Sequence, residues 1–152
     1  MSNSLYERDF YAWANEQASL LRAGRLSEAD LENIAEEIES MGRSEKRELV
    51  SRLTVLLLHL LKWRFQPGLR GTSWRLSIEE QRRAVARHLA DSPSLRGRLP
   101  DALALAYTDA ILAAERETGL ARNTFPSVCP WTYEQIMDAA FWPEETAHED
   151  VA

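Results

Sequence analysis

The sequence predicts an all-α protein, a bundle of four to five main helices with a C-terminal segment rich in proline and aromatic residues packed across it. Three observations support this class. Apolar residues recur along most of the chain at the spacing of a helix with one buried face. Glycine, proline and serine divide the chain into pieces of helical length. No stretch between turn signals alternates apolar and polar residues as a half-buried strand would.

Two helices are expected in the first part of the chain. Ser4 and Glu7 have the spacing of a capping box that opens the first helix, and Gly24 ends it. Ser27 caps the second helix, and Gly42 ends it. One face of this second helix should be buried, because it carries a regular apolar stripe made of Leu31, Ile34, Ala35, Ile38 and Met41.

The third expected helix is the central one. It opens at Ser44 and ends near Trp63, before Pro67 and Gly68. Its apolar arc covers more than half of its circumference, so the helix should contact several neighbours at once. The arc consists of Leu49, Leu53, Leu56, Leu57, Leu60 and Leu61.

Two further helices follow the central one. The fourth begins between Ser73 and Ser77 and ends near Asp91. The fifth starts at Pro100 and stops at Gly119. Proline suits the first turn of a helix, because the N–H group that it lacks would have no partner there.

The last part of the chain alternates aromatic residues and prolines around a short helix capped by Thr132. We expect this segment to extend over the bundle and to cover its open side. The sequence therefore predicts one helical domain over residues 1–152, with an ordered core at about 5–143 and an acidic tail at 144–152. The alternating groups are Phe125-Pro126, Cys129-Pro130-Trp131 and Phe141-Trp142-Pro143.

Composition favours a cytoplasmic protein without a metal or a cofactor. Cys129 is the only cysteine, so the chain offers neither an internal disulfide nor a zinc-binding cysteine pair. The N-terminus carries acids and lacks the apolar stretch of a secretory signal. The longest apolar run, Leu53 to Leu61, is much shorter than the ~20 residues of a membrane-spanning helix.

Charge is distributed unevenly along the chain, although the net charge is only −6. Residues 1–42 hold 9 acids and 3 bases, residues 43–98 hold 5 and 13, and residues 99–152 hold 10 and 2. A basic middle between acidic ends is found in proteins with an anion-binding face. It is also found where helices of opposite charge pack side by side, and we favour this second interpretation.

Six ordered blocks of the sequence carry a family resemblance. They are Tyr6-Glu-Arg-Asp-Phe-Tyr-Ala-Trp13, Glu36-Glu-Ile-Glu-Ser-Met-Gly42, Leu56-Leu-Leu-His-Leu-Leu-Lys-Trp63, Ser73-Trp74, Asp91-Ser-Pro-Ser-Leu95 and Cys129-Pro130. Over about residues 5–143 the chain resembles the bacterial domain-of-unknown-function family number twenty-nine. The resemblance implies an all-helical fold, and it implies no reaction because the family has no established activity. Trp131 departs from the family pattern, in which tyrosine more often follows Cys-Pro.

Polar side chains at the margins of the apolar stripes form the first candidate site, a polar pocket. Two carboxylates and an imidazole can bind a metal ion or act as a general acid and base. The spacing does not require a metal, because the Glu-x-x-His pattern of di-metal bundles occurs only at Glu145 and His148 in the acidic tail. The residues of this candidate pocket are Asp30, Glu37, His59, Lys62 and Arg82.

A structural role for the same residues is the alternative that the pattern favours. Arg82 falls within the inward arc of the fourth helix, where a guanidinium group must find acceptors. We therefore expect Arg82 to be at least partly buried and paired with a carboxylate of the second helix, preferably Glu37. His59 should find a polar partner in the stripe that it shares with Lys62.

A second candidate site, for anions, lies where bases and aromatic residues interleave. Surfaces of this composition stack nucleobases and bind phosphates. Trp63 and Trp74 also fit the apolar stripes of their own helices, and the excess of acids in the whole chain disfavours nucleic acid as a partner. The candidate anion-binding residues are Lys62, Arg64, Arg70, Trp74 and Arg75.

Three functions are compatible with these observations. The first is a non-enzymatic binding or interaction protein of a bacterial cytosol, which acts on another protein or on a second copy of itself. It ranks first because the chain supplies amphipathic surfaces and no catalytic motif. The alternative is a nucleic-acid-binding regulator that uses the region from Lys62 to Arg75. The third is a metal-dependent hydrolase that uses Asp30, Glu37 and His59. No membrane partner is expected.

Overall fold

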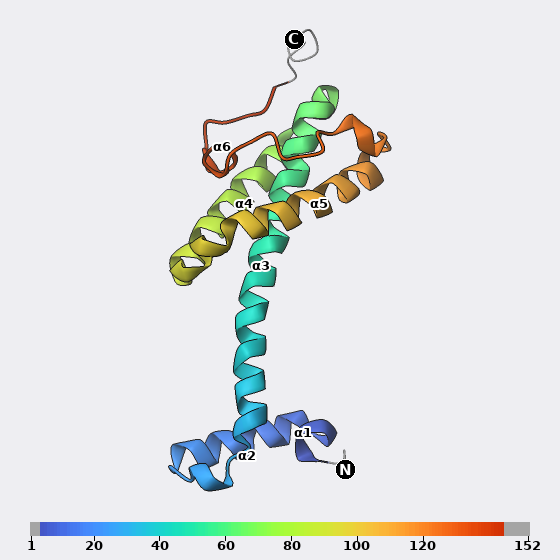
Figure 1. The fold of residues 1–152 in the computed structure, drawn as a ribbon. Helices are drawn as coiled ribbons and strands as arrows, with labels where there is room; N and C mark the ends of the chain where they lie inside the picture. Colours follow the sequence, from blue (N-terminus) through green and yellow to red (C-terminus); the bar gives the residue numbers. More distant parts are fainter. Residues whose placement is uncertain (1–3, 145–152) are drawn as a thin grey trace. The chain divides into compact units, whose positions relative to one another are not determined.

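The computed structural model describes residues 4–144 and is all-helical in that range, with no strand. The predicted fold class is therefore confirmed. The predicted acidic tail lies outside the described residues, apart from Glu144, and so do Glu145 and His148. The α-helices are α1 (Leu5–Arg8), α2 (Phe10–Arg22), α3 (Leu31–Phe65), α4 (Thr72–Asp91), α5 (Leu99–Thr118) and α6 (Tyr133–Met137) (Figure 1). Short 3-10 turns occupy Leu26–Glu28, Pro67–Leu69, Pro93–Arg98 and Arg122–Thr124.

The chain divides into two compact units, residues 1–45 and residues 46–152. The described part of the first unit contains α1, α2 and the N-terminal part of α3. The second contains the rest of α3 and the helices that follow it. The two units share one helix, because α3 runs without interruption from the first into the second. The expectation of a single domain over residues 1–152 stays a prediction.

The first expected helix is interrupted at Asp9. Ser4 caps α1 as predicted, because its hydroxyl oxygen accepts a hydrogen bond from the backbone N–H of Glu7 at 3.4 Å. Asp9 has a φ of −152°, outside the helical region, and its carboxylate caps α2 by accepting from the N–H of Ala12 at 3.1 Å. Gly24, with a φ of +73°, follows the last turn of α2 and confirms the predicted stop.

The predicted break at Gly42 is wrong. α3 extends over 35 residues and includes both Gly42 and Ser44. It begins at Leu31, so the predicted cap at Ser27 is wrong as well, because Ser27 lies in the preceding 3-10 turn. Glycine ends a helix when it adopts a positive φ, but inside a helix it costs only ~1 kcal/mol relative to alanine. The flanking residues are mostly good helix formers and outweigh that cost.

The core of the second unit is built around the leucine face of α3. All six leucines predicted for this face are completely buried. Burial of one such side chain contributes about 1.5–3 kcal/mol, so this face is a major source of stability. The residues that α4 adds to the core are Ile78, Val85 and Leu89, and those that α5 adds are Ala102, Ala106, Tyr107, Ala110 and Ala114.

The C-terminal segment packs across this core, as predicted. The ring of Trp142 lies 4.7 Å from the ring of Trp63, measured between centroids. The ring of Phe125 lies 5.2 Å from that of Phe65 in an edge-to-face arrangement. Thr132 caps α6 with a complete capping box, as its position in the sequence indicates.

Arg82 ties the C-terminal segment to α4. Its side chain is only 6% exposed. The Nε group donates to the carbonyl oxygen of Ile136 at 2.7 Å, and Nη2 donates to that of Phe141 at 2.8 Å. The predicted burial is confirmed, but the predicted pairing with Glu37 is wrong, since Glu37 instead accepts a hydrogen bond from Tyr6.

Replacing Arg82 by methionine should lower the free energy of unfolding by about 3 kcal/mol, because two buried carbonyl oxygens lose a charged donor. Urea titration followed by circular dichroism measures the loss. Arg83, its exposed neighbour on α4, gives the control, and Arg83→Met should change the same quantity by less than about 0.5 kcal/mol. Small and equal losses in the two variants would show that the carbonyl bonds contribute little.

Gly42 and Gly119 should respond in opposite directions to replacement by alanine. A Cβ atom at either position meets no atom within 4 Å, so the backbone decides the result. Gly42→Ala should stabilise by ~1 kcal/mol because the residue is helical. Gly119→Ala should destabilise by about 1–2 kcal/mol, because Gly119 has a φ of +76°. Thermal unfolding tests both, and a destabilised Gly42→Ala variant would mean that α3 does not continue through this position.

Candidate functional site

Asp30 and Glu37, the two carboxylates of the predicted polar pocket, belong to the first unit and have partners there. Asp30 accepts hydrogen bonds from the side-chain amide of Asn33 at 2.8 Å and from the indole N–H of Trp13 at 3.1 Å. The bond from Asn33, with a smaller contribution from Trp13, lowers the pKa of Asp30. Glu37 accepts from the hydroxyl of Tyr6, and this bond raises the pKa of Tyr6 to about 12.

His59, Lys62 and Arg82, the remaining members of the predicted pocket, belong to the second unit. The Nδ1 atom of His59 lies 2.8 Å from the carbonyl oxygen of Val55 in its own helix. Lys62 donates to Glu117 of α5 at 2.7 Å. Arg82 binds the two backbone carbonyls described above. Each of the three side chains thus has its own partners, and none bonds to another in the range that the structure describes.

The predicted anion-binding residues also make contacts inside the second unit. Arg70 donates to the backbone carbonyl of Trp63 at 2.6 Å. Arg75 pairs with Glu79 at 3.3 Å. The guanidinium of Arg64 lies 4.9 Å from the ring centroid of the adjacent Phe65. Much of the positive charge between positions 62 and 75 therefore makes hydrogen bonds, ion pairs or cation–π contacts within the second unit.

The ammonium group of Lys62 lies 5.0 Å from the ring centroid of Trp74, which is half-buried. This cation–π contact and the ion pair with Glu117 leave the Lys62 side chain only 12% exposed. A side chain held in this way contributes to the packing of α3 against α4 and α5. It is poorly placed to follow a phosphate backbone.

A different basic surface, which the sequence pattern did not single out, lies between α3 and α4. It is a groove of about 560 Å³ lined by Arg52 of α3 and by Arg83 and Arg87 of α4. Glu79 and Glu80 line the same groove and reduce its net charge. The spacing of Arg83 and Arg87, one turn apart on the exposed face of α4, was the signal that could have predicted it.

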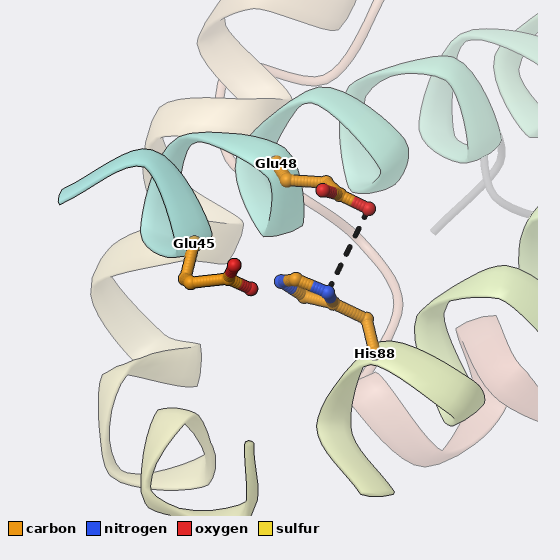
Figure 2. Close-up of side chains that lie close together, drawn as sticks. All are labelled: Glu45, Glu48 and His88. Atoms are coloured by element: carbon orange, nitrogen blue, oxygen red, sulfur yellow. Dashed lines mark ion pairs between the residues drawn. The ribbon is translucent and has the colours of Figure 1, made fainter. Parts of the chain in front are cut away.

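His88 and Glu48 form a second contact that the sequence pattern did not indicate. Figure 2 shows the buried imidazole of His88 on α4 facing Glu48 on α3, with 3.7 Å between Nδ1 and the carboxylate. Figure 2 also shows Glu45, which precedes Glu48 by one turn and is the last residue of the first unit. These residues carry the types of group that bind divalent metals. Glu48 also accepts from Arg52 at 3.0 Å, so its charge is balanced without a metal ion.

An apolar groove of about 380 Å³ runs between α2 and the N-terminal part of α3 in the first unit. We call it the α2–α3 groove. The residues that line it from α2 are Phe10, Trp13, Ala14, Gln17, Ala18 and Leu21. Those that line it from α3 are Ile34, Glu37, Ile38 and Met41.

Large apolar side chains of the α2–α3 groove are exposed. The exposed fraction is 49% for Phe10, 40% for Leu21, 62% for Ile38 and 67% for Met41. The prediction that the apolar stripe of this part of α3 is buried is therefore wrong, because Leu31, Ala35, Ile38 and Met41 are exposed and only Ile34 is half-buried. A unit of this size has too few neighbouring helices to cover the stripe, and among its described residues only Trp13 and Gln17 are buried.

The floor of the α2–α3 groove is held by hydrogen bonds and ring contacts. Trp13 is bound to Asp30, and the rings of Tyr6 and Trp13 meet edge to face with 4.7 Å between their centroids. The side-chain oxygen of Gln17 accepts from the backbone N–H of Asp30 at 2.7 Å. These contacts fix α2 against the start of α3 and so fix the shape of the groove.

No helix in the described range is long and apolar enough to cross a lipid bilayer. No curated protein and no solved structure is detectably similar to the chain. The profile of the family described as Domain of unknown function DUF29 matches residues 5–142, a range that contains all six sequence blocks noted above. Because this match extends over most of the 152 residues, the chain belongs to the DUF29 family.

Proposed function

We propose that the chain is a non-enzymatic interaction protein of a bacterial cytosol, and that its first unit binds a helix of another protein in the α2–α3 groove. The observation that carries this proposal is the exposure of Phe10, Leu21, Ile38 and Met41 along one continuous groove. Contiguous apolar surface of this kind marks interaction sites on folded proteins. The cytosolic location fits a sequence whose only cysteine is Cys129.

The groove has the form that accepts an amphipathic helix. Its two walls are helices, and each presents apolar side chains three or four residues apart, as in Ile34, Ile38 and Met41. A helix with apolar residues at the same spacing can lay them between the two walls. Complete burial of a side chain such as Ile38 contributes about 1.5–3 kcal/mol, and the entropy lost on association offsets part of the total.

The contacts below the groove reduce the cost of binding. Tyr6, bound to Glu37, and Trp13, bound to Asp30, connect α1 and α2 to the start of α3. A groove whose walls are already in place loses less conformational entropy when a partner enters. Asp30 and Glu37, the two carboxylates of the candidate polar pocket, thus support the proposed interaction by positioning the walls of the groove.

A nucleic-acid-binding regulator ranks second. The arginine groove of the second unit supports it, because Arg83 and Arg87 are exposed whereas Lys62 and Arg70 are bound internally. The two glutamates that line the same groove weaken its positive potential.

Ile38→Glu should abolish binding of partner helices, because a carboxylate in an apolar contact loses its hydration without gaining a partner. We would select binders from a display library of helical peptides with randomised surfaces, using the whole chain as bait. Selected peptides should carry an apolar stripe, and their Kd values, measured by biolayer interferometry, should rise at least ~100-fold for Ile38→Glu.

Val128→Glu is the matched control, because Val128 lies in the second unit and is 76% exposed. This variant should bind the selected peptides as the unmodified chain does. The proposed function is wrong if the peptides bind Ile38→Glu and the unmodified chain equally well.

A further inference from the structure

We infer that Glu45 and Glu48 of α3 and His88 of α4 form a binding site for a divalent transition metal ion such as zinc. This inference is independent of the proposed function. It follows from the donor groups that the three side chains offer, from the distances between their donor atoms and from the burial of His88 (Figure 2).

The three side chains offer one imidazole nitrogen and two carboxylates. This donor set suits zinc and related transition metals, because imidazole is a good ligand for them, whereas magnesium and calcium prefer sites made of oxygen atoms. Open zinc sites are built from three protein ligands of these types, with water in the fourth position. Two carboxylates and a neutral imidazole also balance the two positive charges of the ion.

The donor atoms lie almost close enough together to share one ion. One donor atom from each of the three side chains lies within 4.8 Å of the other two. The Nδ1 atom of His88 is 3.7 Å from the carboxylate of Glu48, which is too far for a hydrogen bond. A tetrahedral zinc ion with bonds of about 2.1 Å holds its donor atoms about 3.4 Å apart. Both glutamates are exposed, so changes of rotamer can bring the carboxylates to that separation.

Helices set the backbone positions of the three residues. Glu48 and His88 belong to the second unit. Glu45 stands one turn before Glu48 on the uninterrupted α3, so both side chains project from the same face of that helix. His88 is in the last turn of α4 and is only 8% exposed, and Val85 and Leu89 beside it are completely buried. The imidazole is therefore held in place, as a metal site requires of at least one ligand.

The hydrogen bond from Arg52 is compatible with a metal ion on Glu48. The Nε group of Arg52 donates to Oε2 of Glu48 at 3.0 Å. A carboxylate has about four acceptor positions on its two oxygens, so this bond occupies only part of its capacity. Carboxylates that bind metals are commonly oriented by hydrogen bonds from outside the site. Arg52 thus positions Glu48, while its own positive charge lowers the affinity for the ion.

Isothermal titration calorimetry of the full chain with zinc chloride tests the inference. We expect one zinc ion per chain with a Kd below about 10 μM. His88→Gln and Glu48→Gln should each raise this Kd at least ~10-fold, because each removes one of three ligands. A large excess of magnesium should not compete, since a site that contains imidazole favours transition metals. The absence of zinc binding to the unmodified chain would overturn the inference.

The two other histidines of the chain give matched controls. His59→Gln and His148→Gln should each leave the Kd for zinc unchanged within about 2-fold, because neither residue belongs to the inferred site. The second control is needed because Glu145 and His148 offer zinc ligands of their own. Zinc binding that His148→Gln abolishes and His88→Gln leaves intact would assign the ion to that pair and overturn the inference.

Thermal unfolding gives a readout that does not depend on replacing the buried histidine. Zinc at about 100-fold its Kd should raise the Tm of the unmodified chain by ~5 °C or more, because the ion binds the folded state. The double variant Glu45→Gln with Glu48→Gln changes two exposed side chains and should lose this rise. A rise of equal size in the double variant would show that these carboxylates do not bind the ion.

Discussion

Burial of the leucine face of α3 is the constraint on which the second unit depends. The face is too wide for one neighbour, so α4, α5 and the C-terminal segment are all needed to cover it. Arg82 holds the last of these in place through backbone carbonyls of Ile136 and Phe141. The N-terminal part of the same helix lies in a unit with fewer elements, and its apolar stripe remains exposed. One helix thus contributes to a closed core at one end and to an exposed apolar groove at the other.

Much of the fold could be predicted because its signals are local. The leucine periodicity, the stop at Gly119 and the cap at Thr132 each depend on a few neighbouring residues, and the structure confirms them. The predicted break at Gly42 failed because a glycine ends a helix only through its φ, which the sequence does not contain. The interruption of the first helix at Asp9 was not predicted either, because an aspartate can lie within a helix or cap one, and only its backbone conformation decides between the two.

The candidate site was less predictable, because the exposure and the contacts of its side chains depend on which helices pack against them in the fold. Periodicity identified the apolar face that contains Ile38 and Met41, but it could not show that both side chains stay exposed in the described part of the fold. The acceptors of Arg82 are backbone carbonyls, which every segment offers equally. The contact between His88 and Glu48 depends on the register of α4 against α3, and no sequence spacing encodes that register.

The small core of the first unit has a consequence for the turnover of the protein. Only Trp13 and Gln17 are buried among its described residues, so local opening of this unit should cost far less free energy than global unfolding. A bound partner would raise that cost by mass action. Copies made in excess of the partner would then be degraded first, since proteases attack the opened state. An exposed groove on a lightly packed unit would in this way match the amount of the protein in the cell to the amount of its partner.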